Sequence, residues 1–245
     1  MKPDDALRRN FARYFELIED ANSRFNLTGV KGWERVRDEL FIRSMRFASP
    51  ALGGNVPASG WLSGRKVLDV GAGAGIPGLV LKLLVPDMRL TLLDSSVKKT
   101  AFLRDVVKEL GLEEVDVVTA RAEEAGRDST LRESYDLVVS RGVARLSELA
   151  ELTIPFAAPG GTVMTAKGAD VGAEIAEAEW AAQTLGAAGT AHSEVDAPGD
   201  APPDTMVYWL KVSPTPDEYP RRNGVPHSNP LTRTASAAKG AARKQ

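Results

Sequence analysis

The sequence has no cysteine and only two histidines among its 245 residues. Without cysteine the chain cannot form disulfide bonds, thiolate nucleophiles or cysteine metal sites. His192 and His227 leave few imidazole ligands for a metal ion. We therefore expect neither a metal centre nor cysteine-based catalysis.

Long apolar runs are also lacking. No stretch of 18 uninterrupted apolar residues occurs, and the first ten residues, MKPDDALRRN, have no apolar segment of the kind found in signal peptides. A net charge of −2 argues against a wholly basic nucleic-acid coat, while an apolar content of 43% is ample for a buried core. We expect a cytoplasmic, monomeric protein that does not enter a membrane.

The order of helical and β-rich segments predicts a chain in three parts. Residues 1–64 form a helical extension, with an amphipathic helix expected at 4–25, a second helix at 33–48 and a turn-rich link at 49–64. Residues 65–212 alternate strands with helices, which favours βαβ units, a parallel sheet and an α/β fold. Residues 213–245 form a basic tail that is expected to be disordered in part.

Within the α/β part, strands are expected at 66–70, 89–93, 115–119, 137–140, 161–166 and 206–211. Helices are expected at 78–84, at 96–110, near residue 122, at 146–157 and at 169–185. The pair Gly160-Gly161 is expected to make a turn into a strand. Residues 186–204 are rich in Ala, Gly, Pro and Asp, which predicts a loop.

The segment from Asp69 to Gly78, DVGAGAGIPG, follows the first expected strand. Gly71, Gly73 and Gly75 accept positive φ and carry no Cβ, so a small molecule can lie against the backbone. Asp69 stands at the carboxyl end of a parallel strand, where open α/β sheets bind ligands, and it can anchor a cationic amino acid group. The segment therefore predicts a cofactor loop.

Asp94 ends the next expected strand, 19 positions after Gly75. An acidic residue at about this distance accepts both hydroxyls of a ribose. Asp69 and Asp94 together fit S-adenosylmethionine, an adenosyl ligand with a charged amino acid tail. Residues Gly73 to Gly78 also satisfy the GxGxxG pattern of dinucleotide sites, but Asp69 would repel a pyrophosphate. S-adenosylmethionine is therefore favoured over a dinucleotide and over a purely structural turn.

Two cations follow later strands, Arg141 in Ser140-Arg141-Gly142 and Lys167 before Gly168. Both are expected at the sheet edge that carries the cofactor loop, where they can clamp a nucleic acid or a small carboxylate substrate. For Arg141 the alternative is a structural ion pair. Arg121-Ala122-Glu123, after the third strand, either borders an adenine or caps a helix.

The segment from Tyr219 to Pro226 combines an aromatic residue and two arginines with prolines. A ring and guanidinium groups on a stiffened chain suit contact with stacked bases and phosphates. We therefore expect Tyr219, Arg221 and Arg222 to contact RNA.

Together these motifs resemble the bacterial small-subunit ribosomal RNA guanine-7 methyltransferases, also called the glucose-inhibited division protein B family. The IPG after the glycine loop, the lysine pair after Asp94 and the SRG and AKG edges are the more specific features, since many methyltransferases share the glycine loop. The resemblance spans most of the chain and is carried by Phe25-Asn26-Leu27-Thr28, Asp69 to Gly78, Leu92 to Ser95, Lys98-Lys99, Phe102-Leu103, Ser140-Arg141, Lys167-Gly168 and Tyr219 to Arg222.

The resemblance implies a class I, Rossmann-like methyltransferase that transfers the methyl group of S-adenosylmethionine to nitrogen 7 of a guanosine in the 16S rRNA of the 30S subunit. Nitrogen 7 has a free lone pair, so no base is required and catalysis can rest on positioning and electrostatics. The resemblance implies that Arg141 and Lys167 hold the RNA and act in catalysis. The implied cofactor contacts are Asp69, Gly71, Ala72, Gly73, Gly75, Pro77, Gly78, Leu79, Asp94, Ser95, Ala122, Glu123 and Arg141.

One departure from the family pattern concerns the substrate side. After the NLT motif the family usually has a His followed three residues later by Asp-Ser, whereas this chain has Leu40 for the His and Arg43 for the Asp, with Ser44 matching. Before the last strand many members have Arg-His where this chain has Asp204-Thr205. Three functions stay open: the rRNA methyltransferase, a divergent methyltransferase acting on another RNA or a small molecule, and a non-catalytic module that binds S-adenosylmethionine or RNA.

Overall fold

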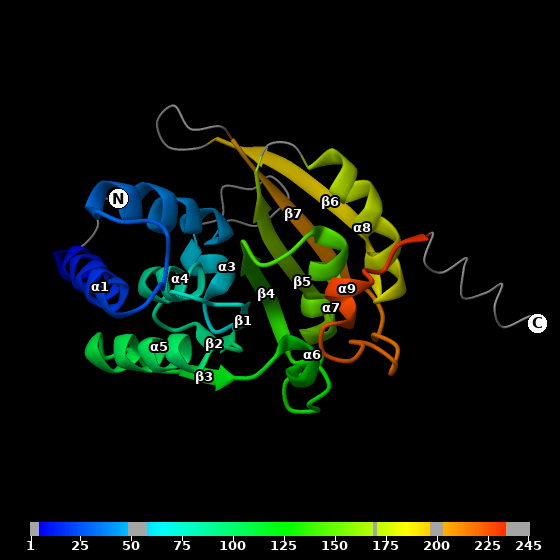
Figure 1. Cartoon of the computed structure of the whole chain (residues 1–245), viewed down its shortest axis with the longest axis horizontal. Coiled ribbons are helices and arrows are strands. Elements are labelled where there is room, and N and C mark those ends of the chain that lie inside the picture. Colours follow the sequence, from blue (N-terminus) through cyan, green and yellow to red (C-terminus); the bar gives the residue numbers. More distant parts are fainter. Residues whose placement is uncertain (1–4, 49–57, 169–170, 197–202, 234–245) are drawn as a thin grey trace, which may run out of the picture. The chain divides into compact units, whose positions relative to one another are not determined.

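The computed structural model describes residues 5–48, 58–168, 171–196 and 203–233. These residues form two compact units that divide after Ala120, and each unit combines strands with helices (Figure 1). The mixed α/β fold expected from the sequence is confirmed. The division into three parts at residues 64 and 212 stays a prediction.

The first unit contains three parallel strands in the order β3-β2-β1. They are β1 (Lys66–Val70), β2 (Arg89–Asp94) and β3 (Val115–Thr119). After their exposed first residues, β1 and β2 are buried throughout, because parallel strands are covered on both faces. Strand β1 pairs with β2, with Asp69 opposite Leu92 in the register. Asp69, near the end of β1, and Asp94, at the end of β2, therefore lie on neighbouring strands.

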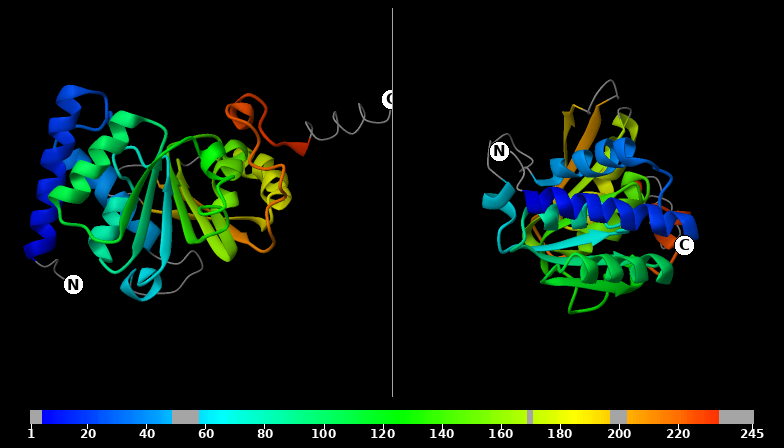
Figure 2. Two further views of the ribbon diagram at one scale, coloured as in Figure 1. Left: turned by 90° about the horizontal axis from the view of Figure 1, so that it is seen from below. Right: turned by 90° about the vertical axis from the view of Figure 1, so that its left-hand side faces the viewer.

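Helices α4 (Gly78–Leu84) and α5 (Val97–Glu109) follow β1 and β2 along the chain. The long helix α1 (Asp5–Arg24) packs against both of them and lies beside α5 in the left view of Figure 2. It buries Tyr14, Ile18 and Ala21, which share one face at steps of four and three residues, as its amphipathic pattern predicts.

The segment expected as a single helix at 33–48 is divided. It contains a short helix α2 (Trp33–Arg35), a π-helix η1 (Val36–Ile42) and a 3-10 helix η2 (Met45–Ala48). The turn-rich link expected at 49–64 contains a further helix, α3 (Ala58–Leu62), and its residues 49–57 lie outside the described residues. The sequence pattern could not distinguish the π-helix from an α-helix, because the spacing of the buried residues Val36, Leu40 and Phe41 also fits an α-helix.

The second unit contains the strand order β4-β5-β7-β6. Strands β4 (Tyr135–Arg141) and β5 (Ala157–Lys167) are parallel, whereas β7 (Asp204–Lys211) is antiparallel to both β5 and β6 (Ala187–Val195). The helices are α6 (Ala122–Ala125), α7 (Leu146–Thr153), the 3-10 helix η3 (Ile154–Phe156), α8 (Gly172–Thr184) and α9 (Val225–Ser228).

Strand β6 corrects the sequence prediction, which assigned residues 186–204 to a loop. Its register shifts between Ala187 and Thr190, and Gly189 has a φ of 150°. The strand forms because it pairs with β7, where Thr190 Oγ1 accepts a hydrogen bond of 3.0 Å from the buried indole of Trp209. A small-residue strand without clear alternation depends on such a partner, which its own sequence does not show.

Gly160 and Gly161 lie inside β5 instead of forming a turn before it. The register against β4 jumps from Ala157 to Thr162 at this point, and Gly160 has a φ of 88°. A Cβ on Gly161 would lie 2.8 Å from the carbonyl oxygen of Tyr135. The two glycines therefore allow a bulge within the strand.

Among the described residues no helix is long and apolar enough to cross a bilayer.

Candidate active site

The glycine loop joins β1 to α4 in the first unit and adopts the strained backbone that its sequence predicts. Gly71, Gly73 and Gly75 have φ angles of 72°, 57° and 86°, in the left-handed region that favours glycine. The amides of Gly71 and Ala72 donate to the carbonyl oxygen of Leu93 at 2.8 and 3.0 Å, which ties the loop to β2. Among the described residues, a Cβ on Gly73 would approach one atom within 4 Å, the carbonyl oxygen of Gly71, so this side of the loop is open to a ligand.

Asp69 is fully buried at the start of this loop. Its Oδ2 accepts a hydrogen bond of 2.8 Å from the amide of Gly78, whereas its buried Oδ1 has no hydrogen-bond partner among the described residues. Burial raises the pKa of Asp69 to about 7, with a smaller contribution from Asp94. A buried oxygen without a donor is costly, and a ligand that brings a cationic donor would satisfy it.

Asp94 ends β2 and is 8% exposed. One carboxylate oxygen accepts from the amide of Gly73 at 2.9 Å and the other from the amide of Ser96 at 2.8 Å. A carboxylate accepts about four hydrogen bonds, so Asp94 can hold the loop and still accept from two hydroxyl groups.

The remaining cofactor candidates of this unit differ in exposure. Leu79 is fully buried and Pro77 is buried at the start of α4, while Ser95 is exposed beyond β2. Gly78 must be glycine, because a Cβ there would lie 2.8 Å from Asp69 Oδ2. Leu79 and Gly78 therefore shape the loop from within the core.

Sequence reasoning missed Tyr14 of α1, whose hydroxyl donates a short hydrogen bond to the carbonyl oxygen of Ala74 in the glycine loop. The helix pattern places Tyr14 on the apolar face and so identifies it only as a core residue. The contact joins residues 60 positions apart, for which the sequence gives no signal.

In the second unit, Glu123 of α6 is 4% exposed. Its Oε1 accepts 3.0 Å from the guanidinium of Arg121 and 2.9 Å from the amide of Gly224. Burial acts to raise the pKa of Glu123, but the donors Arg121 and Gly224 outweigh it and hold the pKa below its usual value. Glu123 is therefore an ionised, fixed group, and its neighbour Ala122 begins the helix.

Arg141 and Lys167 differ in placement. Arg141 ends β4 and pairs with Ala166 in the register, so Lys167, one residue later, begins on the opposite face of the sheet. The Lys167 ammonium donates to the carbonyl oxygen of Ala144 at 2.8 Å and forms a 3.0 Å ion pair with Glu174. From the sequence, both cations are expected at one sheet edge because each follows a strand. This register instead starts their side chains on opposite faces of the sheet.

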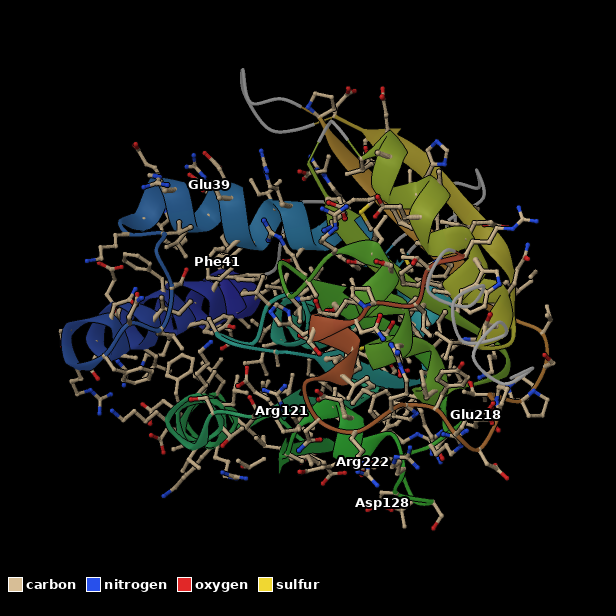
Figure 3. All side chains as sticks on the ribbon, turned by 45° about the vertical axis from the view of Figure 1, so that its right-hand side comes forward. Glu39, Phe41, Arg121, Asp128, Glu218 and Arg222 are labelled. Carbon is tan, nitrogen blue, oxygen red and sulfur yellow. The ribbon has the colours of Figure 1, made fainter. Side chains whose placement is uncertain are left out.

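The segment 213–228, which we call the C-terminal strap, is held by hydrogen bonds of the second unit. One nitrogen of the Arg132 guanidinium donates to the carbonyl oxygen of Tyr219 at 2.7 Å, and the other donates to those of Thr215 and Pro216 at 2.6 and 3.3 Å. In Figure 3 the strap, in orange, passes beside the green α6, with Arg222 labelled on it. These residues of the expected tail are therefore ordered, while residues 234–245 lie outside the described residues.

Arg221 of the strap forms an ion pair with Glu151 of α7, which is fully buried. The Arg221 backbone amide donates at 2.7 Å, and its side-chain Nε and Nη2 donate at 2.9 and 2.6 Å. Arg222 is exposed, and Tyr219 is partly buried. The RNA contacts expected for Tyr219, Arg221 and Arg222 stay predictions, and Arg221 already has a structural role.

The two substituted family positions lie in the first unit. Leu40 is 9% exposed within η1, and its carbonyl oxygen accepts a short hydrogen bond from the buried Ser44 hydroxyl. Arg43 is partly exposed.

Within the described residues no group of three or more His, Cys, Asp or Glu side chains could hold a metal ion.

Two solved structures similar to this chain are named as methyltransferases. A putative O-methyltransferase from Klebsiella pneumoniae aligns with a TM-score of 0.53 and 13% identity, covering 87% of this chain and 92% of that one. Precorrin-6y C5,15-methyltransferase from Geobacter metallireducens GS-15 aligns with a TM-score of 0.51 and 16% identity, covering 75% and 92%. These likenesses show the class I methyltransferase fold.

Sequence comparison is more specific. Residues 7–198 match the family model described as rRNA small subunit methyltransferase G. A ribosomal RNA small subunit methyltransferase G from Roseiflexus sp. (strain RS-1) is 40% identical over 231 residues, which cover 94% of each chain. Another, from Brevibacillus brevis, is 38% identical over 227 residues, covering 93% of this chain and 92% of the relative. The chain therefore belongs to the rRNA small subunit methyltransferase G family.

Proposed function

We propose that this protein is an S-adenosylmethionine-dependent methyltransferase that methylates nitrogen 7 of a guanosine in 16S rRNA. Its family membership supports a small-subunit rRNA substrate. The structural observation that carries the proposal is the buried carboxylate of Asp69, whose Oδ1 has no partner among the described residues, next to an open glycine loop.

The residues of the first unit fit the cofactor. The free oxygen of Asp69 suits its ammonium group, Asp94 has lone pairs left for the ribose hydroxyls, and the open backbone at Gly73 admits close approach. The family resemblance adds Ala122 and Glu123 at the adenine. When bound, S-adenosylmethionine supplies a methyl group on a positively charged sulfur.

The protein's own contribution is binding and orientation. Nitrogen 7 of guanine needs no deprotonation before it attacks a methyl group, so the site requires no His or Cys base. Arg141 is the proposed RNA-holding residue of β4, and exposed Arg222 adds a phosphate contact. Lys167 and Arg221 would have to share or exchange their partners Glu174 and Glu151 to bind RNA.

We further propose that the protein acts in the cytoplasm as a monomer on the 30S particle or its rRNA. The test is transfer of labelled methyl from S-adenosylmethionine to 30S subunits and to deproteinised 16S rRNA from a strain that lacks the family enzyme, with the modified base mapped. Label at nitrogen 7 of one guanosine supports the proposal and identifies which substrate form is used.

Two negative outcomes separate the alternatives. Cofactor binding without incorporation into 16S rRNA would contradict the proposed substrate and favour a divergent substrate side at Leu40 and Arg43. Absence of cofactor binding would contradict the methyltransferase function itself. An Arg141→Ala variant that binds the cofactor normally but methylates poorly would support RNA clamping, and full activity in that variant would remove Arg141 from this role.

A further inference from the structure

Tyr14 brings the N-terminal helix α1 into direct contact with the glycine loop. Its side chain is fully buried, and its hydroxyl donates to the carbonyl oxygen of Ala74. The next amide, that of Gly75, donates to the carbonyl oxygen of Ala72 at 2.7 Å. Both ends of the Ala74–Gly75 peptide group are therefore held, one by the loop itself and one by α1.

The fit between the ring and the loop leaves no room for a side chain. A Cβ on Gly75 would lie 2.7 Å from the Tyr14 hydroxyl oxygen. The requirement for glycine at position 75 thus comes from the contact with Tyr14, and from the side chain of Leu79, as well as from its positive φ of 86°.

An aromatic cluster holds the Tyr14 ring in place. Phe41 of η1 stacks on Tyr14 with ring centroids 5.3 Å apart and an interplanar angle of 22°. Phe11 and Trp33 pack on Phe41 at 5.1 and 6.4 Å. In Figure 3 Phe41 points from η1 toward α1, whereas Glu39 points away on the other side of the same helix.

The hydroxyl of Tyr14 is in its protonated, donating form. Burial raises the pKa of Tyr14 well above its usual value, and the negative charge of Asp69 raises it further. The phenol therefore keeps its proton at neutral pH, where it donates to the Ala74 carbonyl oxygen.

We propose that Tyr14 is a positioning residue of the cofactor site, which fixes the Ala74–Gly75 peptide so that the glycine loop is ready to receive the amino acid end of the cofactor. This inference rests on the proposed function, in which the loop binds S-adenosylmethionine. Through Tyr14 the N-terminal helix would contribute to cofactor binding. It holds the glycine loop in order beforehand, and an ordered loop loses less entropy when a ligand binds.

The test uses Tyr14→Phe, which removes one oxygen and keeps the ring. The matched control is Tyr208→Phe on β7, which also removes a hydroxyl from a buried tyrosine, in this case one bonded to Ser193 at 3.1 Å. Calorimetry with S-adenosylhomocysteine measures cofactor affinity without RNA. We expect about a five- to tenfold weaker Kd in Tyr14→Phe, as for one lost hydrogen bond, and an unchanged Kd in Tyr208→Phe.

Steady-state kinetics supply the readout that a purely structural role would not move. The KM for S-adenosylmethionine should rise by the same factor in Tyr14→Phe, with kcat and the KM for RNA unchanged. A wild-type Kd in folded Tyr14→Phe, or a loss confined to kcat, would overturn the inference. If the wild-type protein itself bound no S-adenosylhomocysteine, the proposed function would fail instead.

A second variant covers the case in which Tyr14→Phe does not fold. Phe41→Leu leaves the Tyr14 hydroxyl in place and loosens only its support, so we expect a two- to threefold weaker Kd. Wild-type affinity in folded Phe41→Leu, with Tyr14→Phe unfolded, would overturn the inference.

Discussion

The two ends of the described chain are attached by different physical means. Helix α1, in the first unit, is held by a buried aromatic cluster and one hydroxyl group, and its ion pairs lie at the surface. The C-terminal strap, in the second unit, is held by the buried carboxylate of Glu151 and by the partly buried guanidinium groups of Arg221 and Arg132. Apolar contacts lose stability gradually as groups are removed, whereas a buried ion pair leaves an unpaired charge when either partner is lost. The two attachments should therefore respond differently to mutation and to pH.

The largest effect is expected from Arg221→Ala. Among the described residues, Glu151 would keep only the backbone amide of residue 221 as a donor to its buried carboxylate. We therefore expect a loss of about 3–5 kcal/mol in the free energy of unfolding. Urea denaturation measures it, and Arg222→Ala, at the adjacent exposed position, should stay close to wild type. The joint variant Arg221→Met, Glu151→Leu should recover most of the loss. Equal small effects at 221 and 222 would show that the strap is not held by its ion pair.

Asp69→Asn should weaken cofactor binding by about 10- to 100-fold, as for a lost charged hydrogen bond. It should not lower stability at neutral pH, because it removes a buried charge. The pKa of Asp69 in the folded protein is about 7 against 3.8 in a model peptide, so its protonated form favours the fold. That contribution is complete below about pH 4 and is lost as the pH rises to about 7, with a slope of at most about 1.4 kcal/mol per unit.

Unfolding and cofactor titrations from pH 4 to 8 would check both statements. Wild-type affinity should rise toward pH 7 as Asp69 ionises, and Asp69→Asn should remove this rise together with the stability slope. An unchanged pH profile in the variant would contradict the assignment.

Glu123→Gln should give the opposite pH response with a smaller magnitude. The pKa of Glu123 is lowered, so its charged form stabilises the second unit above its usual pKa, and this stability is lost as the pH falls through the lowered value. We expect the variant to lose about 1 kcal/mol at pH 7 and to become less sensitive to acid. Glu124→Gln, at the exposed neighbour, is the control. A larger effect at 124 than at 123 would show that the contacts of Glu123 are unimportant.

Arg13→Ala should have the smallest effect. Its ion pairs with Glu16 and Glu109, at 2.8 and 2.7 Å, are exposed on the surface of α1 and α5. Exposed pairs contribute little because water and salt screen them. Thermal unfolding at low and high salt should not separate the variant from wild type. A clear loss at low salt would mean that charge, as well as aromatic packing, holds α1.

The sequence predicted those parts of the fold and site that depend on local pattern. Strands β1 and β3 and helix α4 have the predicted bounds, and the glycine loop has the predicted positive φ angles. Asp69 was singled out by its place at the carboxyl end of an apolar strand, and Asp94 by ending the next strand at a spacing typical of ribose sites. Their cofactor contacts stay predictions.

Other features depend on partners that are distant in the chain. The pairing of β6 with β7, the Tyr14 contact with Ala74 and the Arg221 pair with Glu151 join segments that no local window contains. The sheet face on which the Lys167 side chain lies depends on a one-residue difference in register, since alternate side chains of a strand point to opposite faces. Such features come from tertiary packing and were beyond single-sequence reasoning.

The half-satisfied carboxylate of Asp69 also has a calorimetric consequence. Because burial raises its pKa to about 7, this group is partly protonated at neutral pH, and an ammonium group that pairs with Oδ1 would release that proton to the solvent. The heat measured on cofactor binding then includes the heat of protonating the buffer. Titrations at pH 7 in phosphate and in Tris should therefore differ in apparent enthalpy, while Asp69→Asn should give the same enthalpy in both buffers.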